Sequence, residues 1–156
     1  MSDFDRAELG APRELVRAEE IAALLRATKT VAVLGIKTEA QADQPAFYVP
    51  AYAAKAGLTV FPVPVYYPDV TSILGRPVTR TVAAIGEAVD LVDVFRRPTD
   101  LAAHVPDLVA ARPRAVWFQQ GIRNDEVAAA LVAAGIYVVQ DRCLLVELRA
   151  LGLGSA

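Results

Sequence analysis

The chain has 156 residues, of which 54% are hydrophobic and 22% charged, which favours one folded domain and excludes a disordered chain. Its formal net charge of −2 argues against a broad surface for nucleic acid or an anionic membrane, and no apolar run approaches the roughly 20 residues that cross a bilayer. The single cysteine, Cys143, excludes an internal disulfide and a cysteine-rich metal site, and a lone thiol fits a reducing cytoplasm.

The elements follow a regular order along the chain. Residues 1–12 are expected to form a flexible N-terminal arm, and residues 13–156 a single domain that begins with a surface helix over 13–28. Strands are predicted over residues 30–35, 58–63, 89–95, 114–119 and 136–140. Helices are predicted over residues 45–56, 81–87, 99–111, 124–134 and 143–151, with a break at Pro106 in the third.

Five short apolar strands separated by helices predict a Rossmann-like, doubly wound α/β fold. It would hold a five-stranded parallel sheet with helices on both faces. In such sheets, ligands bind beyond the carboxyl ends of the strands, where the winding changes direction. The residues that follow each strand are therefore the candidates for a binding site.

The first strand, Val31-Ala32-Val33-Leu34-Gly35, leads into a candidate pyrophosphate loop, Gly35-Ile36-Lys37-Thr38. A glycine here lets the backbone approach an anion, and the donors would be backbone N–H groups, the Thr38 hydroxyl and the Lys37 ammonium. The loop has only one of the glycines of the dinucleotide-binding fingerprint, so a solvated turn is the alternative.

No acidic residue follows the second strand directly. Residues 58–68 include Val63 and Pro64 but neither Asp nor Glu, whereas an NAD site usually places a carboxylate there for the ribose hydroxyls. A nucleotide whose ribose carries a phosphate fits this segment better. Arg76 and Arg80 are candidates for that sugar phosphate.

The third and fourth strands also end in groups that suit a ligand. Phe95, Arg96 and Arg97 could stack on adenine and pair with phosphate, or they could be a core phenylalanine and two solvated arginines. After the fourth strand, Gly121 permits a tight turn, and Gln119 and Gln120 could hold the amides of a ligand, with capping of the next helix as the equal alternative.

The sequence offers no catalytic arrangement. His104, the only histidine, is expected inside a helix and away from every strand end, so no Ser/His/Asp or Cys/His set can be built. Asp90 and Asp93 are expected on one face of the third strand, without the further ligands of a metal site. Cys143 at a helix start is a candidate reactive thiol, with a buried, inert cysteine as the alternative.

Five segments together resemble a known family. They are the Val31–Gly35 strand with its loop, Gln44-Pro45-Ala46-Phe47-Tyr48, Val89-Asp90-Leu91-Val92-Asp93-Val94-Phe95-Arg96, Trp117-Phe118-Gln119-Gln120-Gly121 and Val139-Gln140-Asp141-Arg142-Cys143. In their order and spacing the chain resembles the small bacterial CoA-binding domain proteins, stand-alone relatives of the CoA-binding domain of the succinyl-CoA ligase α subunit. The resemblance covers about residues 14–152.

This resemblance implies that coenzyme A lies along the carboxyl ends of the strands. The implied contacts are Gly35, Ile36, Lys37 and Thr38 at the pyrophosphate, Val63 and Pro64 beside the adenosine, Phe95, Arg96 and Pro98 near the adenine, and Gln119 and Gly121 towards the pantetheine arm. Many relatives carry a small residue and then serine after the first glycine, where this chain has Ile36 and Lys37. The ligase's catalytic phosphohistidine belongs to a different domain.

The favoured function is non-catalytic binding of coenzyme A or an acyl-CoA, with no enzymatic activity. An NAD(H)-binding redox-sensing module is one alternative, because the fold alone permits it. A thiol-based sensor that acts through Cys143 is another. Neither nucleic acid nor a membrane is expected as a partner, and the Ala-rich helices could support a homodimer or a contact with another protein.

Overall fold

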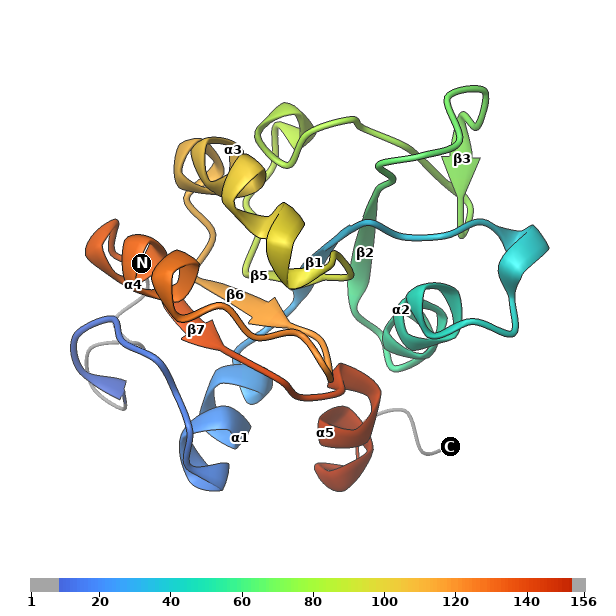
Figure 1. Cartoon of the computed structure of the whole chain (residues 1–156). Helices are drawn as coiled ribbons and strands as arrows, with labels where there is room; N and C mark the ends of the chain where they lie inside the picture. The colour runs from blue at the N-terminus through green and yellow to red at the C-terminus, as the bar shows by residue number, and fades with distance from the viewer. Residues whose placement is uncertain (1–8, 153–156) are drawn as a thin grey trace.

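The computed structural model describes residues 9–152, and a parallel sheet of five strands in the order β2-β1-β5-β6-β7 forms its centre (Figure 1). The strands are β1 (Thr30–Leu34), β2 (Thr59–Val63), β5 (Leu91–Val94), β6 (Ala115–Phe118) and β7 (Tyr137–Val139). Each of them lies within a range predicted from the sequence. The predicted Rossmann-like, doubly wound α/β fold is confirmed.

Helices cover both faces of the sheet (Figure 1). One face carries α1 (Ala18–Arg26), α2 (Pro45–Lys55) and α5 (Leu144–Ala150), and the other carries α3 (Val105–Ala111) and α4 (Asp125–Ala133). Two apolar clusters match these layers, since Val31 packs in the same cluster as Leu24 of α1, and Phe118 in the same cluster as Leu131 of α4. Burial on both faces explains why the strands are continuous apolar runs. Within residues 9–152, no helix is long and apolar enough to cross a membrane.

The winding of the chain changes direction between β1 and β5. From β1, the chain passes through a 3-10 turn, η2 (Glu39–Gln41), and α2 to reach β2 on one side. It then returns past β1 to β5 through the hairpin of β3 (Ser72–Ile73) and β4 (Arg76–Pro77) and a second 3-10 turn, η3 (Ala83–Ile85). The carboxyl ends of β1 and β5 therefore form the switch point, where open α/β sheets hold ligands.

Two predicted helices differ in the structure. The segment 81–87 forms only η3. The segment 99–111 begins one residue earlier as a 3-10 helix, η4 (Pro98–His104), and becomes α3 only at Val105. Pro106 lies in the first turn of α3, where a missing N–H costs no helical hydrogen bond, and the predicted break is found as the change from 3-10 to α-helix just before this proline.

The predicted N-terminal arm lies mostly outside the described residues, because only residues 9–12 of it belong to them. Leu9 is buried, and the carbonyl of Gly10 accepts a hydrogen bond from the Tyr137 hydroxyl. A parallel bridge between Glu14 and Val138 then extends the sheet beyond β7. The segment before α1 therefore packs against the edge strand.

The expectation that Asp90 and Asp93 share one face is wrong, because residues three apart on a strand point to opposite faces. The Asp90 carboxylate accepts hydrogen bonds from two backbone N–H groups at the start of β1, at 2.8 and 3.1 Å. Asp93 lies inside β5 with no exposed surface, and within residues 9–152 neither of its carboxyl oxygens has a hydrogen-bond partner. Burial raises the pKa of Asp93 well above its ordinary value, and the nearby backbone N–H of Val94 opposes this only in part.

Candidate functional site

The switch point is built on a close approach between the chain after β1 and the chain after β5. Gly35 has a φ of +88°, and a Cβ atom there would lie 2.4 Å from the backbone oxygen of Phe95. The N–H of Gly35 donates to the carbonyl of Val63 at 2.9 Å, which joins the end of β2 to the same place. The sequence predicted this glycine as a means of approaching an anion, whereas in the structure the neighbouring backbone itself requires it.

Arg96 lies directly at this switch point, with its Cδ atom 3.2 Å from where a Gly35 Cβ would be. Its Nε donates to His104 Nε2 at 3.2 Å, and one Nη donates to the Tyr66 hydroxyl at 3.3 Å. Its other Nη lies 3.5 Å from the Asp100 carboxylate. The guanidinium also lies over the Tyr66 ring, 5.5 Å from the centroid. Three side chains therefore hold one cation in place, and its side chain is only 14% exposed.

The position of His104 corrects the prediction that it lies away from every strand end. Because η4 is a 3-10 helix, it brings His104 back to Arg96, eight residues earlier in the chain. Nε2 accepts the N–H of Arg96 and so carries no proton. Burial, together with the charge of Arg96, lowers the pKa of His104 below its ordinary value. His104 is therefore a neutral partner of Arg96 at pH 7.

The loop after Gly35 closes on its own hydrogen bonds. The N–H of Lys37 donates to the carbonyl of Ala46 at 3.1 Å, and the N–H of Thr38 donates to Gln41 Oε1 at 3.1 Å. The Thr38 hydroxyl donates to the same Oε1 at 2.7 Å and caps η2. Of the N–H groups of residues 36–38, only that of Ile36 has no partner within residues 9–152, and the Ile36 side chain is buried in the core. The loop offers fewer donors than its sequence suggests.

Lys37 is the second cation of this loop. Its Nζ donates to Gln44 Oε1 at the N-cap of α2. The first residue of α2 is Pro45, which has no N–H. The next N–H, that of Ala46, has no partner among the described residues. The structure thus brings an ammonium group and the amino end of α2 to one side of the loop.

The other predicted cations, Arg76, Arg80 and Arg97, differ from Arg96 in their contacts. Arg80 donates to the backbone carbonyls of residues 66, 67, 68 and 70 at 2.9–3.3 Å. Arg97 is 79% exposed and pairs with Asp100 at 2.9 Å. Arg76 lies beside the middle of β2, with its guanidinium 5.7 Å from the centroid of the Phe61 ring, at a cavity of about 90 Å³. The structure therefore does not bring Arg76 to the switch point.

Capping contacts hold the end of β6. Gln119 is buried, and its Oε1 accepts the N–H of Leu144, the first residue of α5, at 3.2 Å. Its Nε2 has no partner within residues 9–152, so it remains a donor for a ligand. The N–H of Gly121 donates to Asp141 Oδ1 at 2.7 Å. Cys143, the N-cap residue of α5, is half-buried against the apolar core.

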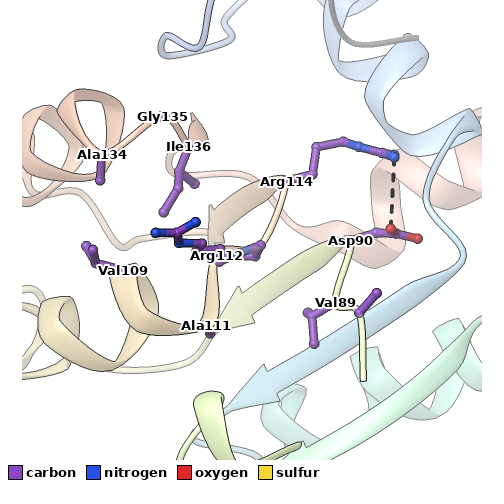
Figure 2. A pocket seen from close by; sticks show the side chains of 11 residues that line it. Val89, Asp90, Val109, Ala111, Arg112, Arg114, Ala134, Gly135 and Ile136 are labelled. Carbon is purple, nitrogen blue, oxygen red and sulfur yellow. Dashed lines mark ion pairs between the residues drawn. The ribbon is translucent and has the colours of Figure 1, made fainter. Parts of the chain in front are cut away.

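A cavity, seen from close by in Figure 2, lies at the amino-terminal ends of the strands, away from the switch point. It measures about 750 Å³ and lies where β5 and β6 begin and where α3 and α4 end. None of the predicted site residues lines it. The largest of the three cavities described for residues 9–152 therefore does not coincide with the switch point.

Comparison with known proteins places this arrangement in a family. Residues 29–149 match the family described as CoA binding domain, which confirms the predicted resemblance and spans the whole switch point. The chain is 28% identical to the uncharacterized protein YneT of Bacillus subtilis over 127 residues, which are 81% of this chain and 90% of that protein. A solved structure from Thermus thermophilus shares 40% sequence identity at a TM-score of 0.79, covering 87% of this chain and 99% of that one. A hypothetical protein from Pyrococcus horikoshii shares 27% identity at a TM-score of 0.77, covering 87% of this chain and 92% of that one.

Proposed function

The chain belongs to the CoA binding domain family, and on that premise we propose that it binds coenzyme A or an acyl-CoA at the carboxyl ends of its strands without catalysing a reaction. The family match, which includes every predicted site residue, is the observation that carries this proposal. The remaining support comes from the chemistry of the switch point.

Arg96 supplies the cation that the phosphates of coenzyme A need. A guanidinium has five N–H donors, and contacts with His104, Tyr66 and Asp100 occupy three of them. The remaining donors suit a phosphate, for which a planar guanidinium is a preferred partner. Because its side chain is already held in place, little conformational entropy is lost when the ligand binds.

The rest of the ligand follows the order of the strands. The adenosine lies beside Val63, Pro64 and Phe95, and the pyrophosphate lies between Arg96 and the amino end of α2. The pantetheine arm then runs towards the end of β6, where Gln119 Nε2 donates to one of its amide carbonyls. The absence of Asp and Glu from residues 58–68 favours a phosphorylated ribose over the free hydroxyls of NAD.

A role without catalysis fits the titratable groups near the switch point. His104 Nε2 is committed to Arg96, and Asp93 is buried below the rim, out of contact with solvent. His104 could accept a proton from a ligand at the strand ends only after losing its hydrogen bond with Arg96, and Asp93 only after leaving the core. Cys143, which follows β7, is not one of the predicted contacts with coenzyme A, and its half-buried thiol has no chemical role in the binding that we propose.

Isothermal titration calorimetry tests the proposal with coenzyme A, acetyl-CoA, 3′-dephospho-CoA and NADH. We expect coenzyme A to bind more tightly than its dephosphorylated form, and NADH to bind more weakly than either. Arg96→Gln should weaken the binding of coenzyme A by about tenfold or more, because a charge-assisted hydrogen bond contributes about 1.5–3 kcal/mol. Arg97→Gln is the matched control, since it removes the same charge one residue away from an exposed side chain.

Two results would contradict the proposal. If NADH bound more tightly than coenzyme A, the site would be a dinucleotide site. If Arg96→Gln and Arg97→Gln weakened coenzyme A equally, Arg96 would not be the specific cation of the switch point.

A further inference from the structure

The cavity at the amino-terminal ends of the strands has the volume of a small-molecule site and is open to solvent, since Arg112 and Ala134 in its lining are exposed. Its volume of about 750 Å³ falls within the range of roughly 300–1,000 Å³ that is typical of ligand pockets. Val89 and Ile136, which are 8% and 2% exposed, form buried apolar walls, and Val109 and Ala134 also line it. The cavity lies at the other end of the strands from the switch point, so it is a separate site.

Arg112 places a positive charge in this cavity. Figure 2 shows its guanidinium between the side chains of Val109 and Ile136. The residue has a φ of 52° and a ψ of 53°, a left-handed conformation that glycine adopts with less strain. Its backbone N–H closes the end of α3 on the carbonyl of Leu108 at 3.2 Å, a bond that any residue but proline could make. Arg112 is an exposed residue, and within residues 9–152 its guanidinium has neither an ion pair nor a hydrogen bond, so no group of the described chain competes with a ligand for it.

The other two charged residues at the cavity, Arg114 and Asp90, form an ion pair with each other. Arg114 turns away from the cavity, with Nη2 4.0 Å from the carboxylate of Asp90 (Figure 2), and its Nη1 donates to the carbonyl of Ala27 at 3.1 Å. The Asp90 carboxylate also accepts two backbone N–H groups at the start of β1. Arg112 is therefore the charge that a ligand would meet.

The helix ends restrict the charge of that ligand. Both α3 and α4 end at the cavity, and the carboxyl end of a helix carries a negative partial charge. These ends oppose a dianion such as a phosphate monoester about twice as strongly as a monoanion, whose single charge the guanidinium of Arg112 can balance. A single guanidinium matches a carboxylate through two parallel hydrogen bonds, and the apolar walls match a hydrocarbon chain.

We propose that this cavity binds a straight-chain monocarboxylate. The carboxylate pairs with Arg112, and the chain lies against Val89 and Ile136. This proposal does not depend on coenzyme A, because the two sites lie at opposite ends of the strands.

Calorimetry with hexanoate, octanoate and decanoate, each below its micelle concentration, tests the apolar part. Each methylene buried in the cavity should tighten binding about fourfold, which corresponds to about 0.8 kcal/mol. Saturating coenzyme A should leave the affinity for octanoate unchanged. An affinity that is independent of chain length, or competition between octanoate and coenzyme A, would overturn the proposal.

Substitutions at Arg112 test the charged part. Arg112→Gln should weaken octanoate binding about tenfold or more, whereas Arg26→Gln, which removes an exposed arginine at the end of α1, should not change it. Arg112→Gly should also lose octanoate, yet melt no lower than the wild type because glycine relieves the left-handed conformation. Octanoate that binds Arg112→Gln as well as it binds the wild type, or inorganic phosphate that binds the wild type more tightly than octanoate does, would overturn the proposal.

Discussion

The buried carboxyl of Asp93 predicts that part of this protein's stability is lost as the pH rises, and that Asp93→Asn abolishes that part of the loss. The side chain has no exposed surface, and neither oxygen has a hydrogen-bond partner within residues 9–152. Burial raises the pKa of Asp93 well above its ordinary value, so the folded protein keeps a proton that the unfolded chain releases.

Proton linkage gives the sign and the size of the effect. Below the pKa of the unfolded chain, about 3.9, both states are protonated and Asp93 adds no dependence on pH. Between that value and the raised pKa of the folded state, the folded state holds one more proton. The free energy of unfolding therefore falls by about 1.4 kcal/mol per pH unit in this interval. Above the pKa of the folded state the dependence ends. Asparagine cannot ionise, so the variant lacks this slope altogether.

Urea unfolding, followed by circular dichroism at several pH values, measures the effect. The difference in unfolding free energy between Asp93→Asn and the wild type should grow by about 1.4 kcal/mol for each unit above about pH 4. All other titrating groups cancel in this difference, and so does any fixed cost of burying an amide. Asp69→Asn, at an exposed position, should follow the wild type. A difference between Asp93→Asn and the wild type that stays constant from pH 4 to pH 8 would refute the reasoning.

Two further predictions concern the switch point. Gly35→Ala should lower the free energy of unfolding by more than about 3 kcal/mol, because its Cβ would lie 2.4 Å from the Phe95 carbonyl oxygen. Gly57→Ala, where no atom lies within 4 Å, should cost only about 1 kcal/mol in the same urea titration, and equal costs would contradict the steric argument. Coenzyme A should also bind more weakly in acid. The pKa of His104 is lowered from its ordinary value of about 6.5, so the imidazole becomes protonated only at a pH below that value. Once protonated, it no longer accepts the N–H of Arg96. His104→Gln should flatten this profile in calorimetry, and a profile that keeps the wild-type shape would show that His104 is not its source.

The strands were predictable because they depend on local patterns. Each is a short apolar run bounded by polar or turn residues, and regular alternation with helices is enough to predict a parallel sheet. The same reasoning predicts the place of the candidate site, since ligands of such sheets bind at the carboxyl ends. Arg96 was identified in this way from its position directly after the third predicted strand.

The contacts around Arg96 were not predictable, because they join residues that are distant in the sequence. Arg96 and Tyr66 are 30 residues apart, and nothing local to either residue indicates the other. His104 was missed because the sequence predicted an α-helix where a 3-10 helix forms, and the two rotate their residues by different angles. The reason for Gly35 was missed too, because it depends on a neighbouring strand that the chain reaches about sixty residues later.

The capping role of Gln119 shows another limit of local reasoning. The sequence left open whether Gln119 holds a ligand or caps the next helix, but Asn124 caps that helix, α4, and Gln119 instead accepts the N–H of Leu144 at the start of α5, 25 residues later. Its Oε1 accepts the N–H of Leu144, whereas its Nε2 has no partner within residues 9–152. The predicted cap of the next helix is therefore wrong, and the contact of Gln119 with a ligand stays a prediction.

The contacts of Arg80 change how its mutants should be interpreted. Its guanidinium donates hydrogen bonds to carbonyl oxygens of a single surface loop. That loop includes Tyr66, whose ring and hydroxyl both contact Arg96. Removing Arg80 would free the loop's backbone and with it the aromatic support beneath the guanidinium of Arg96. Weaker binding of a nucleotide by such a mutant would therefore reflect a less ordered loop and a less well-positioned Arg96. It would not show that Arg80 itself contacts the nucleotide.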